Sequence, residues 1–94
     1  MPVIPDRART LAAFRFRALG DETRLAILEL LVGGERAVAD LMEVTGLGQS
    51  LVSHHLRSLR ECGLVSTRRE GRWIRYSIVP DAVDATIRIL AEYQ

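Results

Sequence analysis

The most constraining feature of the chain lies in residues 48–78, where the spacing of apolar side chains changes from helical to strand-like. The first half has apolar residues at i, i+4 and i+7, namely Val52, Leu56 and Leu59. This spacing predicts a helix with one buried stripe. The second half alternates between apolar and polar residues in 64–70 and 72–78 around Gly71, which predicts two strands and a tight turn. The chain is therefore expected to fold as a short helix followed directly by a hairpin.

The helix face opposite the stripe carries hydrogen-bonding side chains of the kinds that read base edges in a major groove. They are Gln49, Ser50, Ser53, His54 and Arg57. At the hairpin, Arg68, Arg69 and Arg72 surround the turn. We expect Arg68 and Arg69 to contact the DNA backbone or minor groove, and Arg72 to reach solvent or phosphate. A polar helix face followed by a basic hairpin predicts DNA binding.

The charge of the chain is unevenly distributed, although its net value is only +1. From Arg57 to Arg75 there are six arginines and two glutamates, a local net charge of +4, so the rest of the chain carries −3. Positive charge gathered in one part of a small domain is typical of a phosphate-contacting face. Because the sequence places no comparable set of acidic residues beside the hairpin arginines, we expect those arginines to face DNA or solvent.

Length and composition are those of one small globular domain. The chain has 94 residues, 48% hydrophobic and 27% charged, and no apolar run approaches the roughly 18 residues that cross a bilayer. We expect one domain over residues 1–94, with a flexible arm over 1–6. Arginines interrupt any apolar signal segment near the N-terminus, and a lone cysteine fits a reducing compartment. The expected location is the cytoplasm, with no membrane contact.

The rest of the chain predicts a winged helix-turn-helix, a mainly helical fold with a small β wing. Helices are expected over 7–19, 21–32, 37–45, 49–62 and from Pro80 onward, with Asp21 as the N-cap of the second and glycines ending the first, second and fourth. The second of these is apolar over most of its circumference, so we expect it to be the central core helix. The third and fourth are short and joined by residues 46–48, which contain two glycines, as in helix-turn-helix motifs.

The first and last helices carry more apolar residues than such a core needs. The surplus consists of Leu11, Phe14, Val83, Ile87 and Leu90. We expect them to form the interface of a two-fold homodimer, which would present two reader helices to successive major-groove segments. The alternative is that both helices simply close over the core of the monomer.

Four motifs in order resemble the ArsR/SmtB family of winged helix-turn-helix repressors. They are ALGDETRLAIL at 18–28, QSLVSHHL at 49–56, LRECGLV at 59–65 and EGRWIRY at 70–76. The resemblance covers about residues 10–93. It implies a homodimer that represses its own operon at an inverted-repeat operator until an inducer, often a metal ion, releases it. Independently of the resemblance, we expect no enzyme, because the sequence has no phosphate-cradling glycine-rich loop and no nucleophile elbow, and its carboxylates lie mostly at helix starts and on solvent faces.

The metal-sensing patterns of that family are not intact in this chain. The thiolate type needs cysteines where Ala37 and Ala39 stand, and alanine has no donor atom. The last-helix type keeps only Asp81, because Val83 replaces its histidine and the distal ligand position falls at Gln94. We therefore expect no metal site and no cofactor. The inducer stays open, and an unrecognised site or a regulatory partner protein could supply the signal.

Several side chains allow a second interpretation. We place His54 outward and His55 half-buried beside Leu51 and Leu59, not as a metal pair. We expect Cys62 to be a packed, inert thiol. Trp73 and Tyr76 could stack on bases, but hydrophobic support of the hairpin is the preferred interpretation.

Two alternatives to the repressor are a winged-helix module that binds protein and a regulator that senses metal or redox state at a non-standard site. The polar content of the helix at 49–62 favours DNA.

Overall fold

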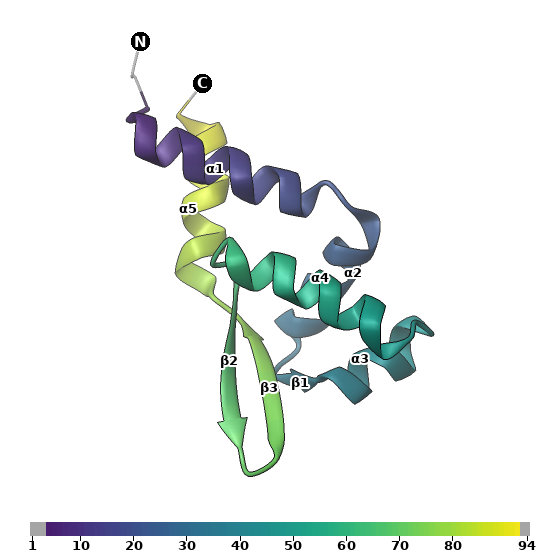
Figure 1. Ribbon diagram of the computed structural model, residues 1–94. Coiled ribbons are helices and arrows are strands. Elements are labelled where there is room, and N and C mark those ends of the chain that lie inside the picture. The colour runs from purple at the N-terminus through teal and green to yellow at the C-terminus, as the bar shows by residue number, and fades with distance from the viewer. Residues whose placement is uncertain (1–3, 93–94) are drawn as a thin grey trace.

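Five helices and three strands follow one another along residues 4–92, the part of the chain that the computed structural model describes. They are α1 (Asp6–Leu19), α2 (Glu22–Val32), β1 (Arg36–Ala37), α3 (Val38–Thr45), α4 (Gln49–Glu61), β2 (Val65–Glu70), β3 (Trp73–Ile78) and α5 (Pro80–Ala91). In Figure 1 the β2–β3 hairpin projects away from the helices, while α1 and α5 lie at the opposite end. The predicted winged helix-turn-helix is confirmed. We call α4 the reader helix and the β2–β3 hairpin the wing.

The core forms where the reader helix packs against the helices around it. Its fully buried side chains come from α2, α3, α4 and the residue before β2: Ile27, Leu41, Val52, Leu56, Leu59 and Leu64. The predicted stripe on α4 is confirmed, because its three members have no exposed surface. Burying a side chain of this size contributes about 1.5–3 kcal/mol. The stripe thus fixes which face of α4 is left outside.

Local sequence signals set the helix ends on either side of the reader helix. Asp21 caps α2 as predicted, since its Oδ1 accepts a hydrogen bond from the Arg24 backbone N–H at 3.0 Å. Gly46 ends α3 in the left-handed conformation, with φ 73°, which favours glycine. Gly63 follows α4 with φ 80°, and the next residue, Leu64, donates its N–H to the Leu59 carbonyl at 3.0 Å. These turns direct the chain from α3 into α4 and from α4 into the wing.

The sheet has a third strand that the sequence analysis missed. Strand β1 pairs antiparallel with β3, and the sheet order is β1-β3-β2. Ala37, which we expected to begin the third helix, lies in β1 instead, and α3 begins at Val38. A two-residue strand has too few positions to show an alternating pattern. It forms because β3 offers a free edge to the segment entering α3.

Two further expectations were wrong. In α2 only Ile27 and Leu31 are buried, whereas Leu25 and Val32 are 52% and 72% exposed, because the core covers only one side of this helix. The expected flexible arm also needs correction within its described part. Ile4 is buried and accepts a hydrogen bond at its carbonyl from Arg9 Nη1, and α1 begins at Asp6. Residues 1–3 of that arm lie outside the described residues.

Candidate nucleic-acid interface

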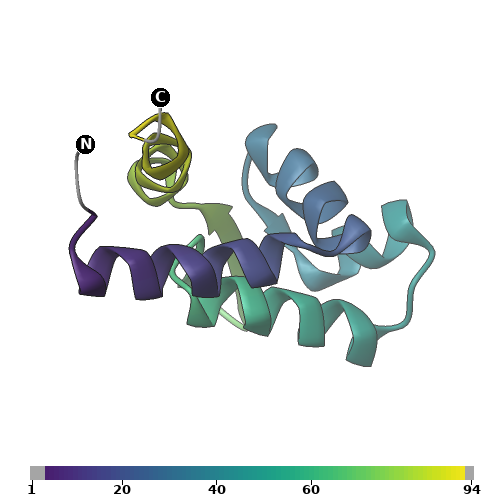
Figure 2. The same cartoon turned by 90° about the horizontal axis from the view of Figure 1, so that it is seen from above.

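The reader helix turns its polar face outward along most of its length. Gln49, Ser50, His54 and Arg57 are exposed, and Ser53 is half-buried. The orientation that the sequence predicts for these five residues is therefore found in the structure. Their contact with DNA stays a prediction. Figure 2 shows α4 along the outside of the molecule, below α1 in that view.

The N-terminus of the reader helix has no side-chain cap. Its N-cap is Gly48, which has no side chain to accept hydrogen bonds from the first-turn N–H groups. These groups and the helix dipole give this end a partial positive charge, which favours a phosphate oxygen. Gln49 and Ser50 begin the helix at this end, so backbone and side-chain donors are close together.

His55 is more deeply placed than we expected. It is only 7% exposed, and its Nδ1 accepts a hydrogen bond from Arg24 Nε at 3.1 Å. The expected neighbour Leu51 is 45% exposed and is not part of the core. A buried imidazole needs a hydrogen-bond partner, and an arginine from α2 provides it. His55 therefore belongs to the support of the reader helix, whereas its neighbour His54 faces outward.

One concave surface joins the reader helix to the wing. Its volume is about 410 Å³, and its polar lining includes Gln49 and Ser53 from α4 and Arg72 from the turn before β3. Its apolar lining comes from the start of α3 and from β3, including Trp73. The structure thus brings three of the predicted DNA contacts to one surface, although Arg72 is distant in the sequence from Gln49 and Ser53.

The wing arginines are not all free, contrary to our expectation. Arg68 donates to both carboxylate oxygens of Glu35, from Nε at 3.1 Å and from Nη2 at 2.7 Å, and from Nη1 to Glu70 at 3.2 Å. Arg75 lies 3.8 Å from Asp40 and 3.7 Å from Glu70. The acidic residues that screen the wing come from outside the hairpin as well as from β2. The charge count in sequence missed them because β1 brings Glu35 and Asp40 next to the wing.

These ion pairs change the proton affinity of their members. The hydrogen bond from Arg68 lowers the pKa of Glu35, and the same carboxylate raises the pKa of Arg68. Both side chains are nevertheless solvent-accessible, and exposed pairs of this kind contribute little to stability. Their effect is on the charge that the wing presents, which is lower than its arginines suggest.

The remaining wing side chains divide into exposed and supporting groups. Arg69 donates from Nε to the carbonyl of Gly71 at 3.3 Å, which holds it at the turn. Arg72 is exposed and forms no ion pair with any residue in 4–92. Tyr76 packs on the core as expected, but Trp73 is 53% exposed and does not support the hairpin from inside. Trp73 lies too far toward the tip for the core to reach it.

The positions that hold metal in the family do not fit a metal here. Ala37 and Ala39 have no donor atoms, and of the two family positions at the start of α5, Asp81 has a carboxylate but Val83 has no donor atom. Gln94, the distal position, lies outside the described residues. Within residues 4–92 no three His, Cys, Asp or Glu side chains come together. Cys62 is 2% exposed, and its thiol donates to the Leu59 carbonyl, so it is packed as predicted.

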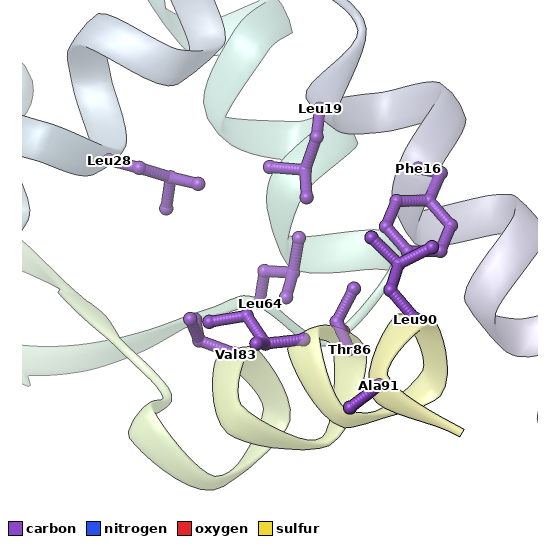
Figure 3. A pocket seen from close by; sticks show the side chains of 9 residues that line it. Phe16, Leu19, Leu28, Leu64, Val83, Thr86, Leu90 and Ala91 are labelled. Carbon is purple, nitrogen blue, oxygen red and sulfur yellow. The ribbon is translucent and has the colours of Figure 1, made fainter. Parts of the chain in front are cut away.

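Exposed apolar side chains lie on α1 and on α5. Leu11 and Phe14 on α1 are about two-fifths exposed, and Ile87 and Leu90 on α5 are about three-fifths exposed. Beside them lies a cavity of about 320 Å³ whose lining contains no charged residue (Figure 3). Val83, which we assigned to the dimer interface, lines this cavity together with Ile87 and Leu90 and also packs against the core.

The comparisons with known proteins agree with this geometry. The profile described as "bacterial regulatory protein, arsR family" matches residues 21–67, which include the reader helix and the start of the wing. The chain belongs to the arsR family. Members of this family are DNA-binding transcriptional regulators and not enzymes.

Individual relatives place the chain more closely within the family. A probable mercury resistance operon repressor of Streptomyces lividans is 49% identical over 69 residues, which are 73% of this chain and 54% of that protein. The chain thus spans about half the length of this relative. The structure of an ArsR-like transcriptional regulator from Rhodococcus sp. RHA1 matches with a TM-score of 0.84 and 32% identity, over 90% of this chain and 80% of that one.

A third comparison concerns assembly. A homodimeric winged helix-turn-helix DNA-binding domain from Mycobacterium bovis, a possible ArsR-family regulator, is 34% identical with a TM-score of 0.77. The match covers 98% of this chain and 91% of that one.

In this chain, none of the helices within residues 4–92 combines the length and hydropathy needed to span a bilayer.

Four charged side chains that contact the reader helix or the wing were not predicted from the sequence. Glu35 and Asp40 neutralise wing arginines, while Arg15 and Arg24 reach the reader helix from α1 and α2. No spacing rule connects residues so far apart in the chain. The only available signal was the motif at 18–28, which contains Arg24 without saying what it contacts.

Proposed function

We propose that this protein is an autoregulating repressor that binds an inverted-repeat operator as a homodimer. The reader helix enters the major groove, with Gln49, Ser50, Ser53, His54 and Arg57 as its contacts to DNA. The wing contributes Arg69 and Arg72 to the backbone or minor groove, and Arg68 contributes less because it is paired. Such a protein works beside the chromosome in the cytoplasm.

The observation that carries this proposal is the common surface of Gln49, Ser53 and Arg72. A side chain that reads bases and one that contacts phosphate must reach the same duplex at once. A helix face and a hairpin that border one concave surface meet this requirement. A protein-binding surface would instead expose large apolar groups along the helix, and this face carries mostly polar ones.

The homodimer is supported by the exposed apolar side chains of α1 and α5. Leu11, Phe14, Ile87 and Leu90 expose surface that a second copy would cover, and Val83 lies at its edge in the cavity of Figure 3. The homodimeric domain from M. bovis, similar over nearly the whole chain, supports the same assembly. Two-fold symmetry of the protein would then require two-fold symmetry of its operator.

The test is binding to DNA upstream of the gene, measured by mobility shift against random DNA of equal length. We expect a preference for an inverted repeat. Ser53→Ala and His54→Ala should each reduce that preference by about 1–3 kcal/mol where a base contact is lost. Equal affinity of the wild-type protein for promoter and random DNA would reject the repressor. Sedimentation at micromolar concentration tests the dimer, and a monomer there would reject that part.

We further propose that the signal that releases DNA is not a tightly bound metal ion. The absence of donor atoms at Ala37, Ala39 and Val83 supports this. An unrecognised site or a partner protein would then carry the signal. Calorimetric titration of the dimer with nickel, zinc and cobalt should give no stoichiometric binding. Tight binding of any of them, accompanied by release of DNA, would contradict the proposal.

A further inference from the structure

Two arginines contact the reader helix from behind, on the side away from its polar face. Arg15, in α1, donates from Nε to the Cys62 carbonyl at 2.8 Å. Arg24, in the first turn of α2, donates from Nε to His55 Nδ1 at 3.1 Å. One bond lies at the C-terminal end of α4 and the other near its middle. The reader helix is thus held at two points by helices that do not themselves carry predicted DNA contacts.

Arg24 is itself fixed at both ends. Its backbone N–H is bonded to the side chain of Asp21, and its Nη1 donates to the Ala18 carbonyl at the end of α1, at 3.4 Å. The side chain therefore connects the end of α1, the start of α2 and the middle of α4. Hydrogen bonds with a charged donor are stronger than neutral ones, so these contacts resist displacement of the helix.

We infer that Arg15 and Arg24 are positioning residues that fix the reader helix relative to α1, and so set its place in the operator. The inference rests on the proposed function. Figure 2 shows α1 running along α4, which places the two helices in one layer. Phe14, adjacent to Arg15, lies on the exposed apolar face of α1. Movement of α1 in the dimer would therefore move the reader helix with it.

The bond to His55 also depends on its protonation. An imidazole nitrogen that accepts a hydrogen bond is unprotonated, so His55 is neutral and carries its proton on Nε2. Burial lowers its pKa from the ordinary 6.5, and the charges of Arg24 and His54 lower it further, while Asp21 acts in the opposite direction. Protonation would place an N–H against Arg24 and break the bond. The contact forms while His55 is neutral and is lost as the pH falls through this lowered pKa.

The first experiment compares the variants Arg24→Gln and Arg88→Gln. Arg88 is an exposed arginine on α5, so its substitution controls for the loss of one positive charge. Binding to the operator fragment and to random DNA is measured by fluorescence anisotropy at several salt concentrations. We expect Arg24→Gln to weaken operator binding about tenfold, with random-DNA affinity and the salt slope unchanged. Arg15→Gln should behave in the same way but lose about threefold. Arg88→Gln should match the wild type.

The second experiment separates positioning from folding by changing His55. His55→Asn keeps an acceptor near the position of Nδ1 but cannot be protonated, and His55→Leu removes the acceptor. We expect His55→Asn to bind the operator within about threefold of the wild type at neutral pH and to lose the acid sensitivity of the wild type. His55→Leu should be weak at every pH. His54 is unchanged in all three proteins, so any contribution from it is common to them.

The outcomes are distinguishable. Equal losses on operator and random DNA for Arg24→Gln, or a lower salt slope, would make Arg24 a phosphate contact and overturn the inference. Wild-type operator affinity in Arg24→Gln would also overturn it, as would identical pH profiles of wild type and His55→Asn. Titration of each variant against saturating DNA measures the fraction of protein that can bind. If the loss of operator affinity is explained entirely by a smaller binding-competent fraction, the variant is misfolded and the result counts against positioning. If the wild type itself does not prefer the operator, the proposed function fails instead.

Discussion

The reader helix and the wing both carry arginines, but the two regions present their charge differently. Arg57 on the reader helix is exposed, with no ion pair to any residue in 4–92. Arg68 and Arg75 in the wing are paired with carboxylates. The helix owes its orientation to a buried stripe, whereas the wing is held by the pairing of β3 with β1, and its ion pairs lower the charge that it presents. A count of arginines therefore overstates what the wing offers to DNA.

The largest expected effect comes from breaking the packing of the reader helix. Leu56→Ala should lower the free energy of unfolding by about 2–5 kcal/mol, because it leaves a cavity where a side chain had no exposed surface. Urea denaturation followed by circular dichroism measures this. Leu25→Ala is the matched control, since Leu25 is 52% exposed, and it should cost less than about 1 kcal/mol. Equal costs would contradict the one-sided packing described above.

An intermediate effect is expected from the unpaired wing arginine. Arg72→Ala should weaken binding to all DNA sequences similarly and reduce the slope of log affinity against log salt by about 1. Arg68→Ala should reduce the slope by less, because Glu35 and Glu70 already neutralise that side chain. Salt titrations of both variants provide the comparison. A larger change for Arg68→Ala would mean that its ion pairs open when DNA binds.

The smallest effect is expected when a wing arginine is released. Glu35→Gln removes the carboxylate that takes two hydrogen bonds from Arg68, and DNA affinity should rise about twofold, within the range of an exposed ion pair. Glu43→Gln, an exposed carboxylate on α3, controls for the loss of one negative charge. If both variants gain equally, the gain reflects net charge and not the release of Arg68.

Periodic features were predictable from the sequence, and features that join distant segments were not. The stripe of Val52, Leu56 and Leu59 and the alternation of the wing repeat several times, so each could be recognised locally. Asp21 and the glycines at the helix ends act through neighbouring residues and were also predictable. Which face of α4 points outward followed from the same stripe.

The missed features all depend on tertiary contacts. Strand β1 exists only because β3 lies beside it, and the pairs of Arg68 with Glu35 and of Arg24 with His55 join residues more than thirty positions apart. The second helix was expected to be central because it is apolar over most of its circumference, but the core covers only one side of α2 and leaves Leu25 exposed. Residue type sets a preference for burial, and the neighbouring elements decide whether it is met.

Strand β1 has a thermodynamic consequence for DNA binding. Because β1 ties the segment before α3 to β3, the wing is ordered before DNA arrives, and little conformational entropy remains to be lost on association. Flexible arms that become ordered on DNA carry that cost at the moment of binding. For this protein we expect the heat-capacity change of binding to be close to that of rigid-body docking, with no contribution from folding of the wing.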